Sequence, residues 1–598
     1  MGQCSYCDLC QKEKESFLAY LPGCEDCVSS NNGNKPTVQL IRLTETEKRQ
    51  FEDEIISTNR NYNNENNILK KNTNNTSNIN NNMNTSIINI NINTSNNNIN
   101  NNVNNNINRQ NSQLQKEKKT EIANQSDQVN NSPIPISSTL FIKELKDLPE
   151  KKYVIKKELG QGSYGVVYLV ENIFTKEQVA MKKIPKTTED LLTDTEVMDE
   201  IEILKTLDHP DIVKLNEFYS TKDNYYIINE YCSGGELYDI IDNEYSETEI
   251  AVIFRQIFSG LAYLHSNNIF HRDLKLENIL IYDTEIVDDL KLYDIKIIDF
   301  GTAKIFDKNQ TARAIVGSSY YIAPEVLNKQ YSKECDLWSA GVILYMFIVG
   351  HAPFDGDTDS LIIKKVKKGK YQKNEERWKK SSKEVRDLIT KLLVYEPENR
   401  LTAEEALKHP WFDKVNSGIF YNNISKEDII KCIKNLLSYG IKSKFEELVW
   451  AYIIHNLPRP KEAKNAIKLF KMANKNGDGK LLRSELKETL LNFVSSYFIK
   501  NFDAIFDLLD SDNNGYIDYE EFLRACIDRN KVITESVLKY AFSFFDKENS
   551  GYINKNIIKS YFVKAKLTEK QFMNIFNEID TNGDGRIDFK EFRKMMLY

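Results

Sequence analysis

The middle of the chain carries carboxylate, amide and ammonium side chains at a spacing that suits phosphate chemistry. The segment His271–Asn278 contains Asp273, Lys275 and Asn278, and Asp299 follows in an Asp-Phe-Gly tripeptide. An aspartate can accept the proton of an attacking hydroxyl, and a lysine two residues later can offset charge on the transferring phosphoryl group. We therefore predict phosphoryl transfer, with Asp273, Lys275 and Asn278 as catalytic residues and with Asn278 and Asp299 as ligands of Mg²⁺.

A glycine-rich turn lies upstream of these residues. Gly160, Gly162 and Gly165 follow a strand-like run, and their backbone amides can close over phosphates without Cβ clashes. This spacing alone also fits a dinucleotide-binding turn. The β-branched run Val166–Val170, however, predicts a further strand, where a dinucleotide fold would begin a helix.

A lysine and a helical glutamate complete the predicted nucleotide site. Lys182 lies on the next strand-like segment, where it can bind the α- and β-phosphates. Glu200 is the predicted partner of this lysine, with Glu196 and Glu202 as alternatives. The predicted nucleotide-binding residues are Leu159, Gly160, Gly162, Gly165, Val167, Lys182 and Glu200.

Taken in order, these motifs resemble the eukaryotic serine/threonine protein kinases over residues 153–412, which also include Ala-Pro-Glu and Asp-Leu-Trp-Ser-Ala-Gly motifs. The resemblance implies that Arg400 pairs with Glu325, and that Lys275 marks a serine/threonine type. It also implies that Glu236 and Glu277 grip a basic residue about three positions before the substrate Ser or Thr. The alternative is that these two glutamates are exposed carboxylates without a partner.

Two positions depart from the pattern of that family. Asn229 falls at the back of the predicted adenine pocket, where asparagine is unusual. Ala314 stands where many kinases carry an activating phosphothreonine, which predicts that activation does not depend on that phosphate. Thr311 is a candidate substitute, and Arg272 would be placed to bind its phosphate.

The C-terminal part contains a fourfold repeat with a period of 34 to 36 residues. A calcium loop needs oxygen ligands at positions 1, 3, 5, 7, 9 and 12, with glycine at position 6. Two loops, residues 510–521 and 580–591, meet this requirement. Their predicted ligands are Asp510, Asp512, Asn514, Tyr516 (carbonyl) and Glu521, and Asp580, Asn582, Asp584, Arg586 (carbonyl) and Glu591, with Asp518 and Asp588 at position 9.

The other two loops are less complete. Residues 474–485 have asparagine at position 1, which removes one negative ligand and predicts weaker binding. The ligand set of this weaker loop is Asn474, Asn476, Asp478, Lys480 (carbonyl) and Glu485. Residues 546–557 end on Ile557 in place of the bidentate glutamate, so we predict a structural, degenerate hand there.

With the kinase pattern first and the EF-hands after it, the chain resembles the calcium-dependent protein kinases from Tyr153 to Tyr598. The resemblance implies an autoinhibitory junction at residues 413–462. One helix face there is apolar, and lysines lie near its start, which fits either an EF-hand groove or the acidic substrate groove. The alternative is a helix packed on its own domain. The apolar residues are Phe445, Leu448, Val449, Tyr452 and Ile453, and the lysines are Lys431, Lys434, Lys442 and Lys444.

The N-terminal region has a different composition. We predict a Cys-containing segment at residues 1–58 and a disordered Asn-rich linker at 59–140, with prion-like self-association as the alternative for the Asn-rich tract. Met1-Gly2 and Cys4 suggest myristate on Gly2 and palmitate on Cys4, because two acyl chains hold a membrane where one does not. Zinc binding by Cys7, Cys10, Cys24 and Cys27, or neither modification, are the alternatives.

The whole sequence predicts an α+β chain: a bilobal kinase fold, then an all-α domain of four EF-hands at residues 463–598. The expected function is calcium-activated serine/threonine phosphorylation with ATP, Mg²⁺ and Ca²⁺. The alternatives are a calcium-responsive inactive scaffold and a kinase regulated by separate calmodulin. The net charge of −7 gives no indication of nucleic-acid binding. Without a secretory signal or a spanning apolar run, we expect a cytoplasmic, partly membrane-associated monomer with reduced cysteines.

Overall fold

The computed structural model describes residues 140–142, 144–162, 165–186, 191–306, 310–415, 419, 424–440, 443–456, 461–495, 502–562 and 569–597. These residues belong to one structural unit, Ile134–Tyr598. The predicted N-terminal segment and nearly all of the Asn-rich linker lie outside the described residues. Within the described residues, no helix has the length and apolar character needed to cross a membrane.

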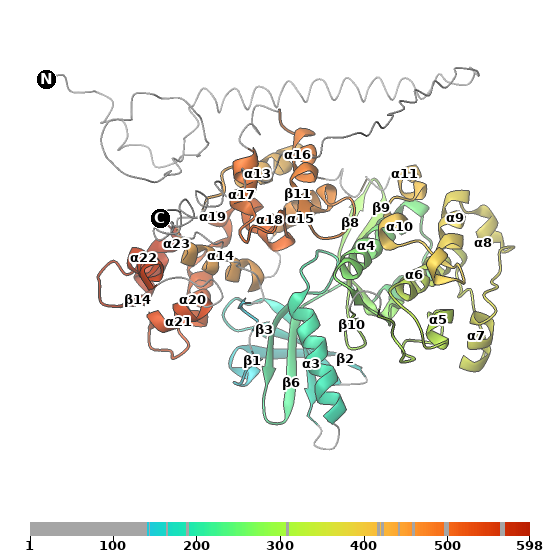
Figure 1. The fold of residues 1–598 in the computed structure, drawn as a ribbon, viewed down its shortest axis with the longest axis horizontal. Coiled ribbons are helices and arrows are strands. Elements are labelled where there is room, and N and C mark those ends of the chain that lie inside the picture. Colours follow the sequence, from blue (N-terminus) through green and yellow to red (C-terminus); the bar gives the residue numbers. More distant parts are fainter. Residues whose placement is uncertain are drawn as a thin grey trace, which may run out of the picture. The chain divides into compact units, whose positions relative to one another are not determined.

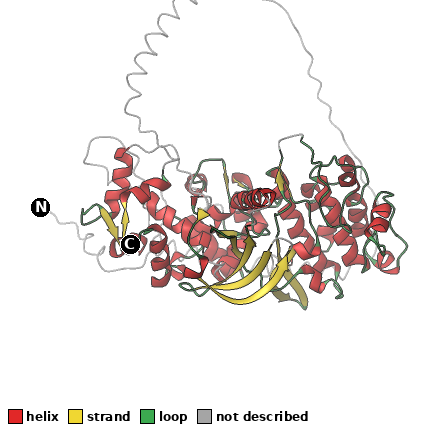
Figure 2. Ribbon diagram, turned by 90° about the horizontal axis from the view of Figure 1, so that it is seen from below, coloured by secondary structure: helices red, strands yellow, loops and turns green. Residues whose placement is uncertain are grey.

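A six-stranded sheet forms the N-terminal lobe, with the strand order β1-β5-β6-β4-β3-β2. Strand β1 runs parallel to β5, and the other neighbours are antiparallel. Figure 2 shows the strands in yellow as a curved layer. The strands are β1 (Glu144–Leu145), β2 (Tyr153–Gly162), β3 (Gly165–Asn172), β4 (Gln178–Pro185), β5 (Leu215–Ser220) and β6 (Asn224–Glu230).

Helix α3 (Leu191–Thr206) packs on this sheet (Figure 1). Its apolar residues Val197, Ile201 and Leu204 recur at helical spacing and are at most 4% exposed. The opposite side of the helix carries charged residues. This packing therefore fixes the rotation of α3 about its axis, which decides which of its glutamates faces β4.

Helices dominate the C-terminal lobe. Helix α4 (Glu247–Ser266) starts at a capping box between Ser246 and Glu249, and fourteen of its residues are buried. Helix α6 (Glu334–Val349) is buried nearly all round and ends at Gly350, which has a φ of 95°. The other helices are α5 (Pro324–Leu327), α7 (Asp359–Val366), α8 (Glu376–Lys380), α9 (Lys383–Leu392), α10 (Ala403–Leu407) and α11 (Pro410–Lys414).

Short strands and 3₁₀ turns position the loops of this lobe. The long hairpin β8–β9 lies against α4, and one core of buried side chains joins the helices to both strands. The strands are β7 (Ile269–Phe270), β8 (Ile279–Val287), β9 (Leu290–Ile297) and β10 (Lys304–Ile305), and the turns are η4 (Pro149–Lys151), η5 (Leu237–Ile240), η6 (Leu276–Asn278) and η7 (Pro397–Asn399).

Two junction helices, α13 (Lys426–Leu437) and α14 (Lys444–Asn456), lead into four helix–loop–helix hands. Position 8 of each loop pairs with position 8 of its neighbour: Ile517 with Leu481, and Ile587 with Ile553. The helices are α15 (Lys461–Ala473), α16 (Arg483–Leu491), α17 (Phe502–Leu509), α18 (Tyr519–Cys526), α19 (Arg529–Val532), α20 (Glu535–Phe545), α21 (Lys555–Tyr561), α22 (Glu569–Ile579) and α23 (Phe589–Leu597), and the strands are β11 (Leu481–Leu482), β12 (Tyr516–Ile517), β13 (Tyr552–Asn554) and β14 (Arg586–Asp588).

Candidate active site and calcium loops

The lysine of β4 contacts two carboxylates, and the site that these three residues form is called the cleft below. Lys182 Nζ lies 2.9 Å and 3.1 Å from the two carboxylate oxygens of Glu200 on α3, and 3.7 Å from Asp299 Oδ1. Burial disfavours the charge of this ammonium, but Glu200 and Asp299 outweigh it and raise the pKa of Lys182. Glu196 and Glu202, the alternatives to Glu200, are exposed. The structure thus brings together the three groups that the sequence assigned to the nucleotide and Mg²⁺.

The glycine-rich turn is the tip of the β2–β3 hairpin. Leu159 and Gly160 lie on β2, and Gly160 pairs with Val167 on β3. At the tip, Gly162 pairs with Gly165. A Cβ on Gly165 would lie 2.1 Å from the carbonyl oxygen of Lys183, so a side chain there would displace the β4 strand. A close approach of two backbones thus requires glycine at this position.

The predicted base is held by three neighbours. Lys275 Nζ lies 2.7 Å from Asp273 Oδ2, and Asn278 Nδ2 donates to the Asp273 carbonyl oxygen at 2.8 Å. Ser318 donates to Asp273 Oδ1 from its backbone N–H (3.0 Å) and its hydroxyl (3.1 Å). Ser318 was not among the predicted residues. Its signal was its place directly after Gly317, on the segment leading to the Ala-Pro-Glu motif.

A buried aspartate of α6 positions the catalytic loop. Asp336 is 1% exposed and accepts the backbone N–H groups of His271 (3.0 Å) and Arg272 (2.8 Å). His265 contacts the same carboxylate at 2.9 Å. The loop can therefore hold Arg272 at a φ of 69°, a left-handed conformation that a non-glycine residue rarely adopts. Asp299 is also left-handed, with a φ of 62°.

Two side chains donate to backbone carbonyls of described residues between Asp299 and the Ala-Pro-Glu motif. Arg272 Nε donates to the carbonyl oxygen of Thr302 at 2.6 Å, and the Tyr331 hydroxyl donates to the carbonyl oxygen of Ala314 at 2.7 Å. Thr311 is exposed. At the far end, Arg400 makes a bidentate pair with Glu325, at 2.6 Å and 3.1 Å, as the resemblance implied.

The two predicted substrate glutamates lie close enough to influence each other. Burial, Asp239 and Glu277 raise the pKa of Glu236, and Lys275 opposes the shift. Glu277 Oε2 is buried and has no hydrogen-bond donor among the described residues. Two crowded carboxylates with spare acceptor capacity are chemically suited to a guanidinium or ammonium group. Behind the adenine site, Asn229 Oδ1 likewise lacks a donor among the described residues.

The second and fourth loops present the donor set that a calcium ion takes. Asp510 accepts the N–H groups of Asn514 and Gly515 at 2.9 Å each, which curls the loop. Glu521, at position 12, accepts the N–H and hydroxyl of Ser511 and would have to turn toward a bound ion. Burial and Asp518 raise the pKa of Glu521 to about 8, and a bound cation would favour the ionised form of this carboxyl.

The fourth loop repeats this arrangement. Asp580 accepts the N–H groups of Gly583 (2.7 Å) and Gly585 (2.9 Å), and Glu591 accepts the N–H of Thr581 at 2.9 Å. Asn582 and Asp584 lie between these groups, and the carbonyl of Arg586 follows them. No three His, Cys, Asp or Glu side chains among the described residues already converge as a preformed metal site. Both loops therefore fit calcium by composition.

The first and third loops differ from these two. In the first, Asn474, Asn476 and Asp478 bond to one another, and Glu485 accepts the N–H of Leu482 at 3.0 Å. In the third, Asp546 curls the loop by accepting Ser550 and Gly551, and Asn554 caps α21 by accepting the N–H of Ile557. The third loop keeps the shape of a hand, but its twelfth position is apolar.

Helix α14 is enclosed on all sides. The five residues of its predicted apolar face are at most 2% exposed. Phe445 packs on Phe545 at 5.4 Å between ring centroids, and Tyr452 stacks on Phe544 at 4.0 Å. The opposite side is buried as well, because Trp450 donates to the Arg524 carbonyl. All three contacts join α14 to EF-hand helices. Of the four lysines, Lys431 and Lys444 pair with nearby acids, Lys434 is half-buried, and Lys442 lies outside the described residues.

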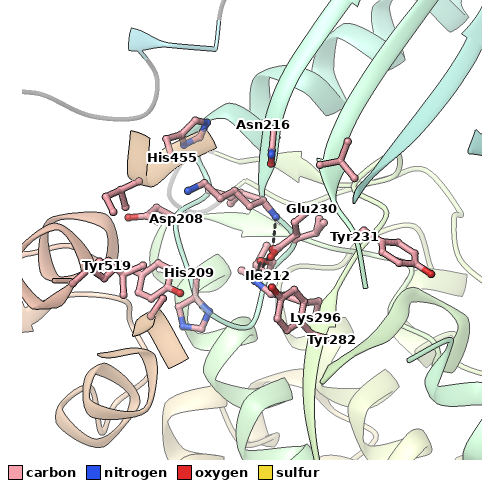
Figure 3. Close-up of a pocket in the computed structure, with 18 of the residues that line it drawn as sticks. Asp208, His209, Ile212, Asn216, Glu230, Tyr231, Tyr282, Lys296, His455 and Tyr519 are labelled. Atoms are coloured by element: carbon pink, nitrogen blue, oxygen red, sulfur yellow. Dashed lines mark hydrogen bonds and ion pairs between the residues drawn. The ribbon is translucent and has the colours of Figure 1, made fainter. Parts of the chain in front are cut away.

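A pocket lies between the kinase and EF-hand regions (Figure 3). His455 and Tyr519 line it from the junction and α18, and His209 and Asn216 line it from the kinase side. Glu520 contacts His455 and Lys214 at 2.8 Å each. Burial, followed by the charge of Lys214, lowers the pKa of His455, and Glu520 opposes this shift.

Comparison with known proteins finds a matching family for the kinase region and another for the EF-hand region. The protein kinase domain family matches residues 153–412, and the EF-hand domain pair family matches residues 463–527 and 535–597. Calcium-dependent protein kinase 4 of Plasmodium falciparum (isolate 3D7) is 38% identical over 475 residues, which are 77% of this chain and 88% of that protein. Calcium-dependent protein kinase 7 of Oryza sativa subsp. japonica is 36% identical over 470 residues, 77% of this chain and 84% of that protein. The chain therefore belongs to the calcium-dependent protein kinase family.

Proposed function

We propose that this chain transfers the γ-phosphate of ATP to Ser or Thr of protein substrates, and that calcium binding to its own EF-hands activates it. The observation that carries the proposal is the assembled cleft, where Lys182 contacts both Glu200 and Asp299. An inactive scaffold would not need a buried ammonium held by two carboxylates together with a positioned base.

The roles of the catalytic residues follow from their contacts. Lys182, held by Glu200, binds the α- and β-phosphates, and Asn278 and Asp299 are the side chains that would hold Mg²⁺. The metal would draw charge from the phosphates when bound. Asp273 Oδ1 already accepts the Ser318 hydroxyl, so this oxygen is able to accept a substrate hydroxyl in the same way. Lys275 offsets charge beside it.

The proposed substrate carries Arg or Lys upstream of the phosphorylated residue. Glu236 and Glu277 support this preference, because burial, Asp239 and Glu277 raise the pKa of Glu236, and Glu277 Oε2 has no donor among the described residues. A basic side chain would relieve the repulsion and supply the missing donors. This contact is remote from the reacting atoms. It should therefore lower the KM of the peptide more than it changes kcat.

Calcium control is proposed to act through the junction. Phe445 and Tyr452 of α14 pack on EF-hand helices, and we propose that this packing corresponds to the released arrangement. At rest, we propose, the junction lies over the substrate groove and its lysines face Glu236 and Glu277. Binding at the second and fourth loops would open the hands and shift the population toward the released arrangement.

The N-terminal proposal rests on sequence alone. Myristate on Gly2 and palmitate on Cys4 would hold a cytoplasmic, monomeric enzyme at a membrane for part of the time. Both residues lie outside the described residues. Mass spectrometry of the N-terminal peptide distinguishes acylation from zinc binding by the nearby cysteines.

The deciding experiment measures phosphorylation of an Arg-x-x-Ser peptide by the full chain, with calcium or with a chelator, and without added calmodulin. We expect activity that depends on calcium. The Asp273→Asn variant is the control for contaminating kinases. Equal rates in both buffers would refute calcium activation, a requirement for calmodulin would favour separate regulation, and no activity in either buffer would favour a scaffold.

A further inference from the structure

We infer that the first EF-hand holds its loop closed with a side-chain amide where a calcium ion would bind, and that it serves as a calcium-independent dock for the kinase domain. The inference deepens the proposed function, on which it rests for its regulatory meaning. The second and fourth loops, residues 510–521 and 580–591, then act as calcium sensors. The first loop, residues 474–485, acts as a fixed attachment to the kinase domain.

The amide of Asn474 occupies the centre of the loop. Its Nδ2 donates to Asn476 Oδ1 (3.2 Å), Asp478 Oδ1 (3.0 Å) and the carbonyl oxygen of Lys480 (3.1 Å). These oxygens are the ligands of positions 3, 5 and 7. The Asn474 Oδ1 accepts the N–H of Gly479 at 3.1 Å. The opposite amide orientation would place oxygen against three oxygens and NH₂ against an N–H, so the contacts fix the orientation.

The second loop shows what the first one lacks. Position 1 there is Asp510, which has acceptors only and cannot donate to the ligands at positions 3 and 5. Its loop contains five carboxylates and no Lys or Arg. The first loop contains two carboxylates, Asp478 and Glu485, against Lys475, Lys480 and Arg483, which gives a net charge of +1. A divalent cation is therefore attracted more strongly to the second loop than to the first.

The first loop is also pressed against the kinase domain. A Cβ on Gly477 would lie 2.8 Å from Leu407 Cδ1 and from Ser259 Cα, and one on Gly479 would lie 2.5 Å from Tyr263 Cδ2. The corresponding glycines of the other loops differ: a Cβ on Gly515, Gly551, Gly583 or Gly585 would meet no atom within 4 Å. Glycine in the first loop thus permits close contact with α4 and α10.

Ion pairs extend this contact along α15, the helix before the loop. Lys471 is 5% exposed at its side chain and lies 2.6 Å from Asp211 and 2.8 Å from Asp294. Burial opposes its charge, but these carboxylates raise the pKa of Lys471. Lys464 and Lys468 pair with acids of the β8–β9 hairpin. The attachment is therefore polar, with Lys468 and Lys471 buried and Lys464 partly exposed, and none of these contacts needs a cation.

Calcium binding by the first loop would break both the hydrogen bonds of the Asn474 amide and the contact of the loop with the kinase domain. The Asn474 amide would have to turn over and give up three hydrogen bonds, and a change in loop shape would move Gly477 and Gly479 against Ser259 and Tyr263. The contact with the kinase domain thus opposes calcium binding by the first EF-hand. The second and fourth loops, with open space at their glycines, have no such constraint.

The test counts bound calcium on the full-length chain by native mass spectrometry. We expect two ions, a fall to one in Glu521→Gln, and no change in Glu485→Gln, which removes the position-12 carboxylate of the first loop. A count that falls by one in Glu485→Gln would overturn the inference. This measurement does not depend on phosphotransfer, so a catalytically inactive chain would refute the proposed function and leave the count valid.

Hydrogen exchange supplies the second measurement on the same samples. We expect the amides of residues 474–482 to be equally protected with chelator and with calcium, whereas those of residues 510–518 change on calcium addition. Protection of the first loop that appears only with calcium would show that the dock is itself calcium-driven, and would overturn the inference.

Discussion

Replacing Lys471 by methionine should separate the EF-hand region from the kinase domain. The change removes the ammonium between Asp211, which is 1% exposed, and Asp294, and leaves both carboxylates facing an apolar chain. Breaking a buried pair by removing one partner costs about 3–5 kcal/mol. That cost corresponds to a factor of roughly 10²–10³ or more in the docking equilibrium.

Hydrogen exchange on the full chain measures this effect. Amides of α4 and of the β8–β9 hairpin that α15 covers should exchange roughly 10²–10³ times faster in Lys471→Met. Lys475→Met is the matched control, because Lys475 lies four residues away and pairs with Glu488 where both side chains are more than 60% exposed. An exposed pair contributes about 0–1 kcal/mol, so the control should change exchange by less than about fivefold.

A third variant tests the cause. Adding Asp211→Asn to Lys471→Met removes one of the uncompensated charges, so protection should recover in part. Equal exchange in Lys471→Met and Lys475→Met would refute the reasoning. So would a double variant that is less protected than Lys471→Met alone, because the penalty would then not come from a buried charge.

Three further changes test the site and the switch. Asp273→Asn should lower the phosphorylation rate by about 10²–10⁴ with unchanged ATP affinity, and a change in affinity alone would contradict the role of a base. Glu236→Gln should raise the KM for an Arg-containing peptide roughly tenfold or more, and a peptide with Ala at that position should show no difference. Tyr452→Ala removes a ring that packs on Phe544, which should destabilise the released arrangement by about 3–5 kcal/mol and raise the calcium concentration for half-maximal activity. An unchanged calcium midpoint would mean that α14 is not part of the switch.

The local chemistry of the cleft could be predicted because its spacing is fixed by the reaction. Motif order predicts a helix glutamate as the partner of Lys182, with Glu200 preferred and Glu196 and Glu202 as alternatives. Even the choice between Glu200 and its neighbours has a physical basis, since Val197, Ile201 and Leu204 turn the apolar side of α3 toward the sheet. Ser318 could not be found in the same way, because a serine near Asp273 in space gives no periodic signal in the sequence.

The full surroundings of α14 and the closed shape of the first loop could not be predicted, for a different reason. An apolar helix face indicates one partner surface, and α14 has at least two: the side opposite Phe445 and Tyr452 contributes Trp450 to a hydrogen bond with α18. In the same way, an asparagine at position 1 indicates one negative ligand fewer. It does not reveal that its amide would donate to three loop oxygens, which depends on the closed shape of the loop.

The start of the described chain has a mechanical consequence. Phe141 is 4% exposed, and its ring lies 5.6 Å from that of Tyr452 and 6.2 Å from that of Phe544. The polypeptide that precedes it is covalently continuous with this aromatic cluster. A pulling force on the N-terminal region would therefore be transmitted first to the side chains that hold α14, before it reached the catalytic cleft. Such a force would then act on the same helix that Phe544 of α20 contacts.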